Sequence, residues 1–353
     1  MPRGFKKAKT SGAARQARQF RFDESLALFQ YMLSLFGCTS LDSLCEGMKD
    51  ETWEGWDEQN ISRYYYFLTT RLFEYPGITK EQLLRYDQNI TSQTMAISGR
   101  RGAFRWKYFQ YMALLFSEIY LDKYFNDPQG LLDGLNAQVT LLNSEREAAD
   151  KLPPYVLDDL NKVAFWQATG SGKTLIMHVN ILQYRHYLEK AGKHATLNRV
   201  ILLTPNEGLS EQHNGEFKLS SMPADIFNKE SGSLYAGQEI SIIDIHKLKE
   251  EGKEKTVSVD AFESNNLVLV DEGHRGAGGE EWMDKRNRLC ADGFSFEYSA
   301  TFGQAMKASG KKEMLHQYAK CILFDYSYKY FYGDGYGKEY SILNLAEEQH
   351  EEQ

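Results

Sequence analysis

The sequence lacks the features that mark a membrane protein, a secreted disulfide scaffold or a cysteine-bound metal site. It has four cysteines in 353 residues, none of them in C-x-x-C spacing, so we expect buried free thiols. No apolar run approaches the ~18 residues that a membrane-spanning helix needs. The first twenty residues are basic and have no apolar block typical of a secretory signal. These absences predict a cytoplasmic protein with no membrane partner.

Each end of the chain lacks charge of one sign. Residues 3–21 contain seven Lys and Arg and no acid, whereas residues 345–353 contain glutamates and no Lys or Arg. The basic end is either a flexible arm that contacts phosphates or a solvated, disordered terminus. The acidic end is either a frayed tail or the point where a longer chain was cut. The formal net charge of −8 argues against a nucleic-acid footprint over the whole surface and leaves a local groove open.

Two sequence patterns are found in the rest of the chain. Residues 23–125 repeat apolar residues at helical spacing, which predicts a mainly helical N-terminal region. Residues 126–161 mix Pro, Gly and charge, which indicates a connector or an insertion. From residue 162 to about 330, short β-rich runs alternate with helical ones. The expected fold class is therefore α/β, with a parallel sheet flanked by helices and preceded by the helical region.

The sequence "ATGSGKT" (168–174) joins a predicted strand to a predicted helix. Its glycines permit a tight turn, and the N–H groups at the start of the helix attract an anion. This pattern predicts a phosphate-binding loop, in which Lys173 contacts the β/γ-phosphates of ATP and Thr174 is a Mg²⁺ ligand. The usual pattern has a further glycine at the position of Gln167. The expected nucleotide-binding residues of the loop are Thr169, Gly170, Ser171, Gly172, Lys173 and Thr174.

A second candidate site lies at the end of the apolar run "NLVLVDEGH" (266–274). Ligands bind at the carboxyl ends of strands in open α/β sheets. Two adjacent carboxylates at a strand end point in different directions, so they can take different roles. Asp271 is expected to hold Mg²⁺ through its water shell, and Glu272 to polarise the attacking water. Together with Lys173, these carboxylates form the expected catalytic set.

Four motifs follow one another along the chain: "ATGSGKT", "LLTPNEGLSEQ" (202–212), "VDEGH" (270–274) and "SAT" (299–301). In order and approximate spacing they resemble motifs I, Ia, II and III of the superfamily 2 helicases and translocases of the DExH type. Within that superfamily the chain is similar to the restriction (Res) subunits of type III and the motor subunits of type I restriction-modification systems, whose loop commonly lacks the first glycine. The resemblance covers about 163–325. It implies a RecA-like domain that binds ATP and Mg²⁺ and acts on DNA or RNA.

The resemblance also implies how nucleic acid is contacted. The residues that would couple the nucleotide site to nucleic acid are His274, Ser299 and Thr301. The residues that would grip a nucleic-acid backbone are Thr204, Pro205 and Gln212. The alternative for this second set is an ordinary strand-to-helix turn that Asn206 caps. In such folds the strand that carries "SAT" lies between the strands of the loop and of the carboxylates.

A helix upstream of the loop is the expected place of adenine recognition. Relatives carry an aromatic-rich helix with a glutamine before the loop, and "RWKYFQYMALL" (105–115) offers Gln110 as the amide and Phe109 as a stacking face. Gln110 lies farther before the loop than is common, which an insertion at 126–161 would explain. An ordinary amphipathic helix explains the same pattern equally well.

Two parts of the related motors have no counterpart in these residues. The second RecA-like domain, with its arginine-bearing motif, does not follow, and we interpret residues 331–353 as the start of a link to it. No nuclease motif is convincing in residues 1–160, so a nuclease or methyltransferase subunit is an expected partner.

We therefore expect the first half of an ATP-dependent DNA motor, with residues 1–22 as a basic flexible arm, residues 162–330 as the ATP-binding domain, and weak turnover in isolation. The competing class is a nucleotide-gated nucleic-acid-binding subunit with negligible ATPase activity. A small-molecule kinase is disfavoured, because such enzymes lack the ordered series of motifs.

Overall fold

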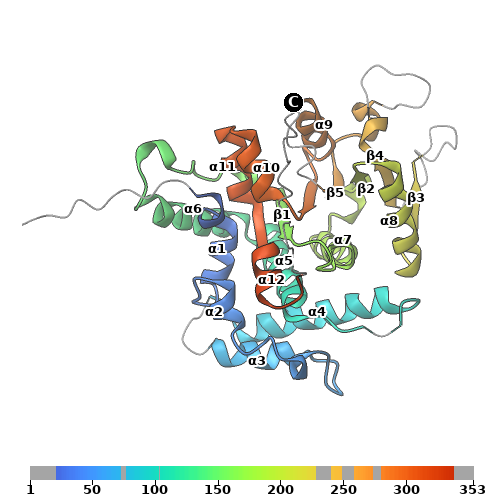
Figure 1. The fold of residues 1–353 in the computed structure, drawn as a ribbon. Helices are drawn as coiled ribbons and strands as arrows, with labels where there is room; N and C mark the ends of the chain where they lie inside the picture. The colour runs from blue at the N-terminus through green and yellow to red at the C-terminus, as the bar shows by residue number, and fades with distance from the viewer. Residues whose placement is uncertain are drawn as a thin grey trace, which may run out of the picture.

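The computed structural model describes residues 21–72, 77–102, 104–227, 240–248, 258–272 and 280–337 (Figure 1). Within these residues a parallel sheet of seven strands has the order β3-β4-β2-β5-β6-β1-β7. The strands are β1 (Lys162–Gln167), β2 (Arg199–Thr204), β3 (Ala224–Ile226), β4 (Ile240–Asp244), β5 (Asn266–Asp271), β6 (Phe294–Ser299) and β7 (Ile322–Tyr326). The predicted α/β class, with a parallel sheet flanked by helices, is confirmed.

The helices fall into two groups along the chain. The first group precedes the sheet and contains α1 (Ala27–Ser34), α2 (Leu41–Cys45), α3 (Arg63–Arg71), α4 (Lys80–Ser98), α5 (Tyr108–Asn126) and α6 (Pro128–Asn143). The second group alternates with the strands and contains α7 (Lys173–Lys190), α8 (Glu207–Leu219), α9 (Glu280–Leu289), α10 (Phe302–Ser309), α11 (Lys312–Cys321) and α12 (Tyr328–Gly333). The helical N-terminal region is confirmed, and α6 occupies part of the segment expected to be a connector.

The strands are buried on both faces, which explains why they are continuous apolar runs rather than alternating ones. In β2, Val200 and Leu202 belong to one hydrophobic cluster, whereas Ile201 and Leu203 belong to another. Successive side chains of a strand point to opposite faces, so the two clusters lie on the two sides of the sheet. In Figure 1, α4, α5 and α7 lie on the lower side and α9 and α11 on the upper side.

The N-terminal helices share a core with the sheet, because one hydrophobic cluster runs from Phe22 to Tyr326. Buried polar contacts join α5 to α7: Asn180 donates to Ser117 Oγ at 3.0 Å, and Gln183 donates to the Leu114 carbonyl at 3.0 Å. The Tyr298 hydroxyl on β6 donates to Asn180 Oδ1 at 2.7 Å. Helix α7 is thus fixed between the N-terminal helices and the sheet.

Strand β6 pairs with β1 on one side and with β5 on the other. This arrangement confirms the expected place of the "SAT" strand. Since all three strands are parallel, the residues that follow them meet at the same edge of the sheet. We call it the carboxyl edge.

A buried charged cluster ties α9 and α11 to β6. Glu297 is fully buried and forms ion pairs with Arg286 at 2.8 Å and with Lys162 at 3.3 Å. The Tyr318 hydroxyl also donates to Glu297 Oε2 at 2.8 Å. Burial alone would raise the pKa of Glu297, but Arg286 and Lys162 hold it below its usual value. Because a buried carboxylate is costly without such partners, the cluster fixes where α9 and α11 pack.

Replacing Arg286 should therefore destabilise the fold strongly. Arg286→Met removes one of the two positive charges that pair with the buried Glu297 carboxylate. We expect the free energy of unfolding to fall by about 3–5 kcal/mol. Adding Glu297→Gln should recover on the order of 1–2 kcal/mol, because no charged carboxylate remains buried. Urea denaturation measures both values.

The matched control is Arg288→Met, on the same helix. Arg288 pairs with Asp260 at the surface, and exposed pairs contribute about 0–1 kcal/mol. Equal losses in Arg286→Met and Arg288→Met would contradict this account of the cluster.

Candidate functional site

The loop between β1 and α7 has the geometry of an anion cradle. Gly170 has φ +85° and Gly172 has φ +90°, a left-handed backbone that residues with a Cβ adopt at a cost. A Cβ at Gly172 would also lie 2.4 Å from Gln110 Nε2. Helix α7 begins directly after the loop, so its unpaired first N–H groups and its positive end belong to the cradle. The buried Ser171 hydroxyl has no hydrogen-bond partner among the described residues.

Lys173 lies in this loop and within electrostatic reach of both carboxylates. Its Nζ donates to the carbonyls of Gln167 and Ala168, each at 3.2 Å. Burial lowers the pKa of Lys173, and the charges of Glu272 and Asp271 act in the opposite direction. The structure thus brings together the three residues of the expected catalytic set. Thr174, in the first turn of α7, is half-buried, and Thr169 is exposed.

The two carboxylates leave the end of β5 in different environments. Asp271 Oδ1 accepts the Glu272 backbone N–H at 3.0 Å, and Asp271 Oδ2 lies 2.9 Å from His213 Nε2. Glu272 has φ +56°, a strained conformation that persists only where the surrounding structure imposes it and that clusters at functional sites. A sharp turn at Glu272 therefore separates the directions of the two side chains.

The "SAT" residues lie next to this turn. Ser299 is buried and its Oγ accepts the Thr301 backbone N–H at 3.0 Å. The Trp166 indole on β1 donates to the Ala300 carbonyl at 3.1 Å. The Thr301 hydroxyl is buried and has no hydrogen-bond partner in the described part of the chain. His274, the third expected coupling residue, lies outside the described residues.

The residues expected to grip a nucleic-acid backbone are only partly accessible. Thr204 is 1% exposed, and its hydroxyl is 2.6 Å from Ser210 Oγ, so it is not presented to a phosphate. Asn206 Oδ1 accepts the Leu209 N–H at 3.0 Å and caps α8, as the alternative predicted. Pro205 is half-buried and Gln212 is exposed on α8, so this face of α8 remains open to a ligand.

Gln110 reaches the loop although it lies far from it in sequence. Its Nε2 donates to the Ser171 carbonyl at 2.9 Å, and its Oε1 accepts the Lys107 N–H at 3.0 Å. Phe109, in contrast, is 2% exposed and stacks on Tyr326 with ring centroids 3.9 Å apart. The expectation that Phe109 offers a stacking face is therefore wrong, because its ring is already covered.

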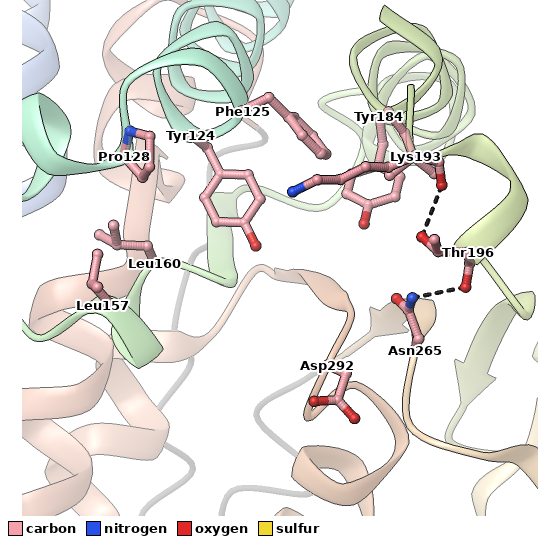
Figure 2. A pocket seen from close by; sticks show the side chains of 11 residues that line it. Tyr124, Phe125, Pro128, Leu157, Leu160, Tyr184, Lys193, Thr196, Asn265 and Asp292 are labelled. Carbon is pink, nitrogen blue, oxygen red and sulfur yellow. Dashed lines mark hydrogen bonds between the residues drawn. The ribbon is translucent and has the colours of Figure 1, made fainter. Parts of the chain in front are cut away.

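A cavity of about 480 Å³ lies at the opposite edge of the sheet (Figure 2). Its lining includes Leu160, Thr196, Asn265 and Asp292, which precede β1, β2, β5 and β6. It is thus distinct from the carboxyl edge. Among the described residues no group of three His, Cys, Asp or Glu side chains could hold a metal ion. In the same part of the chain no helix has the length and apolarity of a membrane span.

Comparison with known proteins agrees with this arrangement. The family model described as "Type III restriction enzyme, res subunit" matches residues 136–304. This segment, just under half of the chain, is therefore similar to the Res subunits of type III restriction enzymes. The match includes the loop, Asp271 and Glu272, and the "SAT" residues, so the resemblance to the Res subunits is confirmed. No curated protein matches the chain significantly.

Three solved structures resemble the chain distantly. The Sulfolobus solfataricus SWI2/SNF2 ATPase core in complex with dsDNA is 13% identical with a TM-score of 0.32, over 46% of this chain and 32% of that chain. T4 UvsW is 15% identical with a TM-score of 0.32, over 68% and 53%. The UvsW helicase from bacteriophage T4 is 14% identical with a TM-score of 0.33, over 82% and 94%. The chain thus spans about a third of the first protein and about half of the second. Similarities this weak identify neither a functional residue nor an activity of this chain.

Two residues near the candidate site were not predicted. His213 contacts Asp271 from α8; its signal in the sequence is a histidine on the buried stripe that includes Ser210 and Phe217. Phe331 lies on α12, and its ring edge would be 3.7 Å from a Cβ at Gly170. No spacing in the sequence connects Phe331 to the loop, because only the packing of α12 after β7 brings it there.

The contact between Gly172 and Gln110 predicts a specific cost for a side chain in the loop. Gly172→Ala and Gly192→Ala both place a Cβ on a left-handed backbone, at about 1–2 kcal/mol. Gly192 has nothing within 4 Å of its Cβ position, whereas Gly172 meets Gln110 Nε2. Gly172→Ala should therefore lose an additional ~0.5–1.5 kcal/mol with the Gln110 hydrogen bond.

Urea denaturation of the two variants measures the difference. Gln110→Ala should remove the clash. In a Gln110→Ala background, Gly172→Ala should therefore lower the free energy of unfolding by only as much as Gly192→Ala does. The same cost for Gly172→Ala and Gly192→Ala in the native background would show that Gln110 does not constrain the loop.

Proposed function

We propose that the chain is the ATP-binding half of a DNA-dependent helicase or translocase, with ATP hydrolysis as its chemical step. One observation supports this most: the loop, the Asp271–Glu272 pair and the "SAT" residues follow three adjacent parallel strands and meet at the carboxyl edge. The charges of Glu272 and Asp271 act on the pKa of Lys173 there. A phosphate loop facing two carboxylates is the arrangement that phosphoryl transfer requires.

The loop residues suit a triphosphate. The left-handed glycines and the start of α7 direct backbone N–H groups toward a bound anion, and Lys173 adds a positive charge. Thr174 and Asp271 would hold Mg²⁺, in part through water. A protein cage is not needed, since Mg²⁺ binds through one or two carboxylates together with substrate phosphates. When bound, Mg²⁺ would neutralise charge on the β- and γ-phosphates.

Glu272 is the proposed general base. It leaves the strand in a different direction from Asp271 because of its positive φ, so it can face the attacking water while Asp271 faces the metal. Thr301 and Ser299, at the end of the intervening strand, are proposed to sense the γ-phosphate and to transmit its loss.

Gln110 and Phe331 are proposed to border the base of the nucleotide. Gln110 is bonded to the loop at Ser171, and Phe331 is half-buried beside Gly170. The Asp334 carboxylate accepts hydrogen bonds from Tyr108 and Tyr326, and these bonds hold the end of α12 against α5 and β7. Phe331 therefore replaces Phe109 as the candidate stacking face.

DNA is the proposed polymer, and RNA is the alternative. The family match concerns restriction enzymes, and the exposed face of α8 with Gln212 is the proposed backbone contact. A second RecA-like domain, in the same chain or on a partner, would supply the arginine that related motors use, which is worth about 10³–10⁵ in rate. Slow turnover of the 353 residues alone is therefore expected.

The roles of Lys173 and Glu272 can be separated by experiment. Lys173→Ala should abolish measurable Mg²⁺-ATP binding in calorimetry, because the loop loses its charge. Glu272→Gln should keep ATP affinity within a few-fold and lower phosphate release by about 10²–10⁴. The matched control is Glu211→Gln, an exposed glutamate on α8 that should change neither value.

Three outcomes would change the proposal. Equal loss of binding and turnover in Glu272→Gln would make Glu272 a metal ligand. Tight ATP binding with no turnover, even with the second domain and DNA added, would favour the nucleotide-gated binding subunit. Unchanged ATP affinity in a folded Lys173→Ala protein would refute the site.

A further inference from the structure

His213 is buried in α8 with its imidazole directed at Asp271. Its Nε2 lies 2.9 Å from Asp271 Oδ2, and the residue is 3% exposed. Its other ring nitrogen, Nδ1, is buried without a hydrogen-bond partner among the described residues. The carboxylate of Asp271 is thus the polar contact that the described structure gives this ring.

The two bonds to Asp271 come from different elements. Oδ1 accepts the N–H of Glu272, which follows Asp271 on the same strand. Oδ2 receives the bond from His213, on a helix that follows a different strand. One bond alone allows the carboxylate to rotate about its Cβ–Cγ axis, whereas two bonds to opposite oxygens fix its plane. The orientation of Asp271 therefore depends on the position of α8.

The next residue along α8 faces outward. Gln212 is exposed and His213 is buried, as expected of neighbours about 100° apart on a helix. Gln212, which could contact a ligand, and His213, which contacts the Asp271 carboxylate, consequently lie on the same turn of α8. A displacement of that turn changes the distance from Nε2 to Oδ2.

The far end of α8 is anchored to other elements. The Arg101 guanidinium pairs with Glu216 at 2.6 Å and donates to Ser220 Oγ at 2.9 Å. His178 on α7 lies 2.8 Å from Ser220 Oγ and stacks on Phe217. These contacts hold the last turns of α8. A ligand that binds at Gln212 would therefore displace the turn of His213 relative to this fixed end.

We propose that His213 is a positioning residue, which sets the orientation of the Asp271 carboxylate and so links the exposed face of α8 to the metal site. The inference rests on the proposed function, since it requires that Asp271 help to hold Mg²⁺. His213 acts through Asp271 and does not touch the reacting atoms. Partners of a metal-binding carboxylate typically change metal affinity about 10–100-fold when removed.

The test compares substitutions that lose or keep the donor. His213→Leu removes the hydrogen bond, and His213→Gln retains an N–H at about the position of Nε2. His213→Asn is a second variant without this hydrogen bond, because its amide is too short to reach Oδ2. It is polar and serves as the test if the leucine variant does not fold. His186→Leu is the control for the loss of an imidazole, because His186 lies on the exposed surface of α7 beside Asn89 of α4.

The measurement is binding of a fluorescent ATP analogue as Mg²⁺ is titrated, with a parallel titration of nucleotide in EDTA. His213→Leu should raise the Mg²⁺ concentration for half-maximal binding about 10-fold or more and leave the affinity in EDTA unchanged. His213→Gln should stay within about 3-fold of the native protein, and His186→Leu should not shift the Mg²⁺ dependence. A second readout is DNA stimulation of phosphate release in the presence of the second domain, which His213→Leu should diminish and His213→Gln should restore.

The outcomes separate the inference from the proposed function. If the native protein binds nucleotide and neither His213→Leu nor His213→Asn shifts the Mg²⁺ dependence, the inference alone is refuted. Equal shifts in the leucine and glutamine variants would also refute it, because they would indicate packing rather than a hydrogen bond. Absence of nucleotide binding by the native protein, with and without Mg²⁺, would refute the proposed function and the inference together.

Discussion

The pairing of β6 with both β1 and β5 is the constraint on which the candidate site depends. Parallel strands that are neighbours in a sheet end at one edge, so the phosphate loop, the carboxylates and the "SAT" residues meet there although they are far apart in sequence. A strand order that placed β1 and β5 farther apart in the sheet would separate Lys173 from Asp271. The buried Glu297 cluster on β6 fixes the helices on the upper side, so the same strand organises the site and the packing around it.

The helices before the sheet contribute directly to this edge. Helix α5 packs against α7 through a buried polar seam, and Gln110 at its start bonds to the Ser171 carbonyl in the loop. Arg101, just after α4, holds the end of α8. Because these helices share one hydrophobic core with the sheet, the loop at the start of α7 is positioned by contacts on both sides, and the N-terminal region is part of the architecture of the site.

The sequence was sufficient for features that depend on local pattern. The apolar runs predicted β1, β2, β4, β5, β6 and β7, whereas the neighbours of β6 were expected only from the family resemblance. Features that depend on distant packing were not predictable: the edge strand β3 is short and has no clear apolar run, Thr204 faces Ser210 rather than solvent, and Phe109 is covered by Tyr326. Phe331 and His213 reach the site only through the placement of α12 and α8.

Several buried polar groups at the carboxyl edge have no hydrogen-bond partner among the described residues. Buried polar groups normally find hydrogen-bond partners. Unpaired atoms also occur elsewhere: Glu118 and Asn266 each leave one atom unpaired but bond through another, and the Ser295 hydroxyl has no partner in the described residues. At the carboxyl edge, the hydroxyls of Ser171 and Thr301 and the whole amide of Gln167 lack partners among the described residues, and Glu272 adopts a left-handed backbone. Unpaired polar groups and local strain tend to coincide where a ligand completes the structure. This local deficit, independent of any motif, therefore indicates the same place for a bound polar ligand as the phosphate loop does.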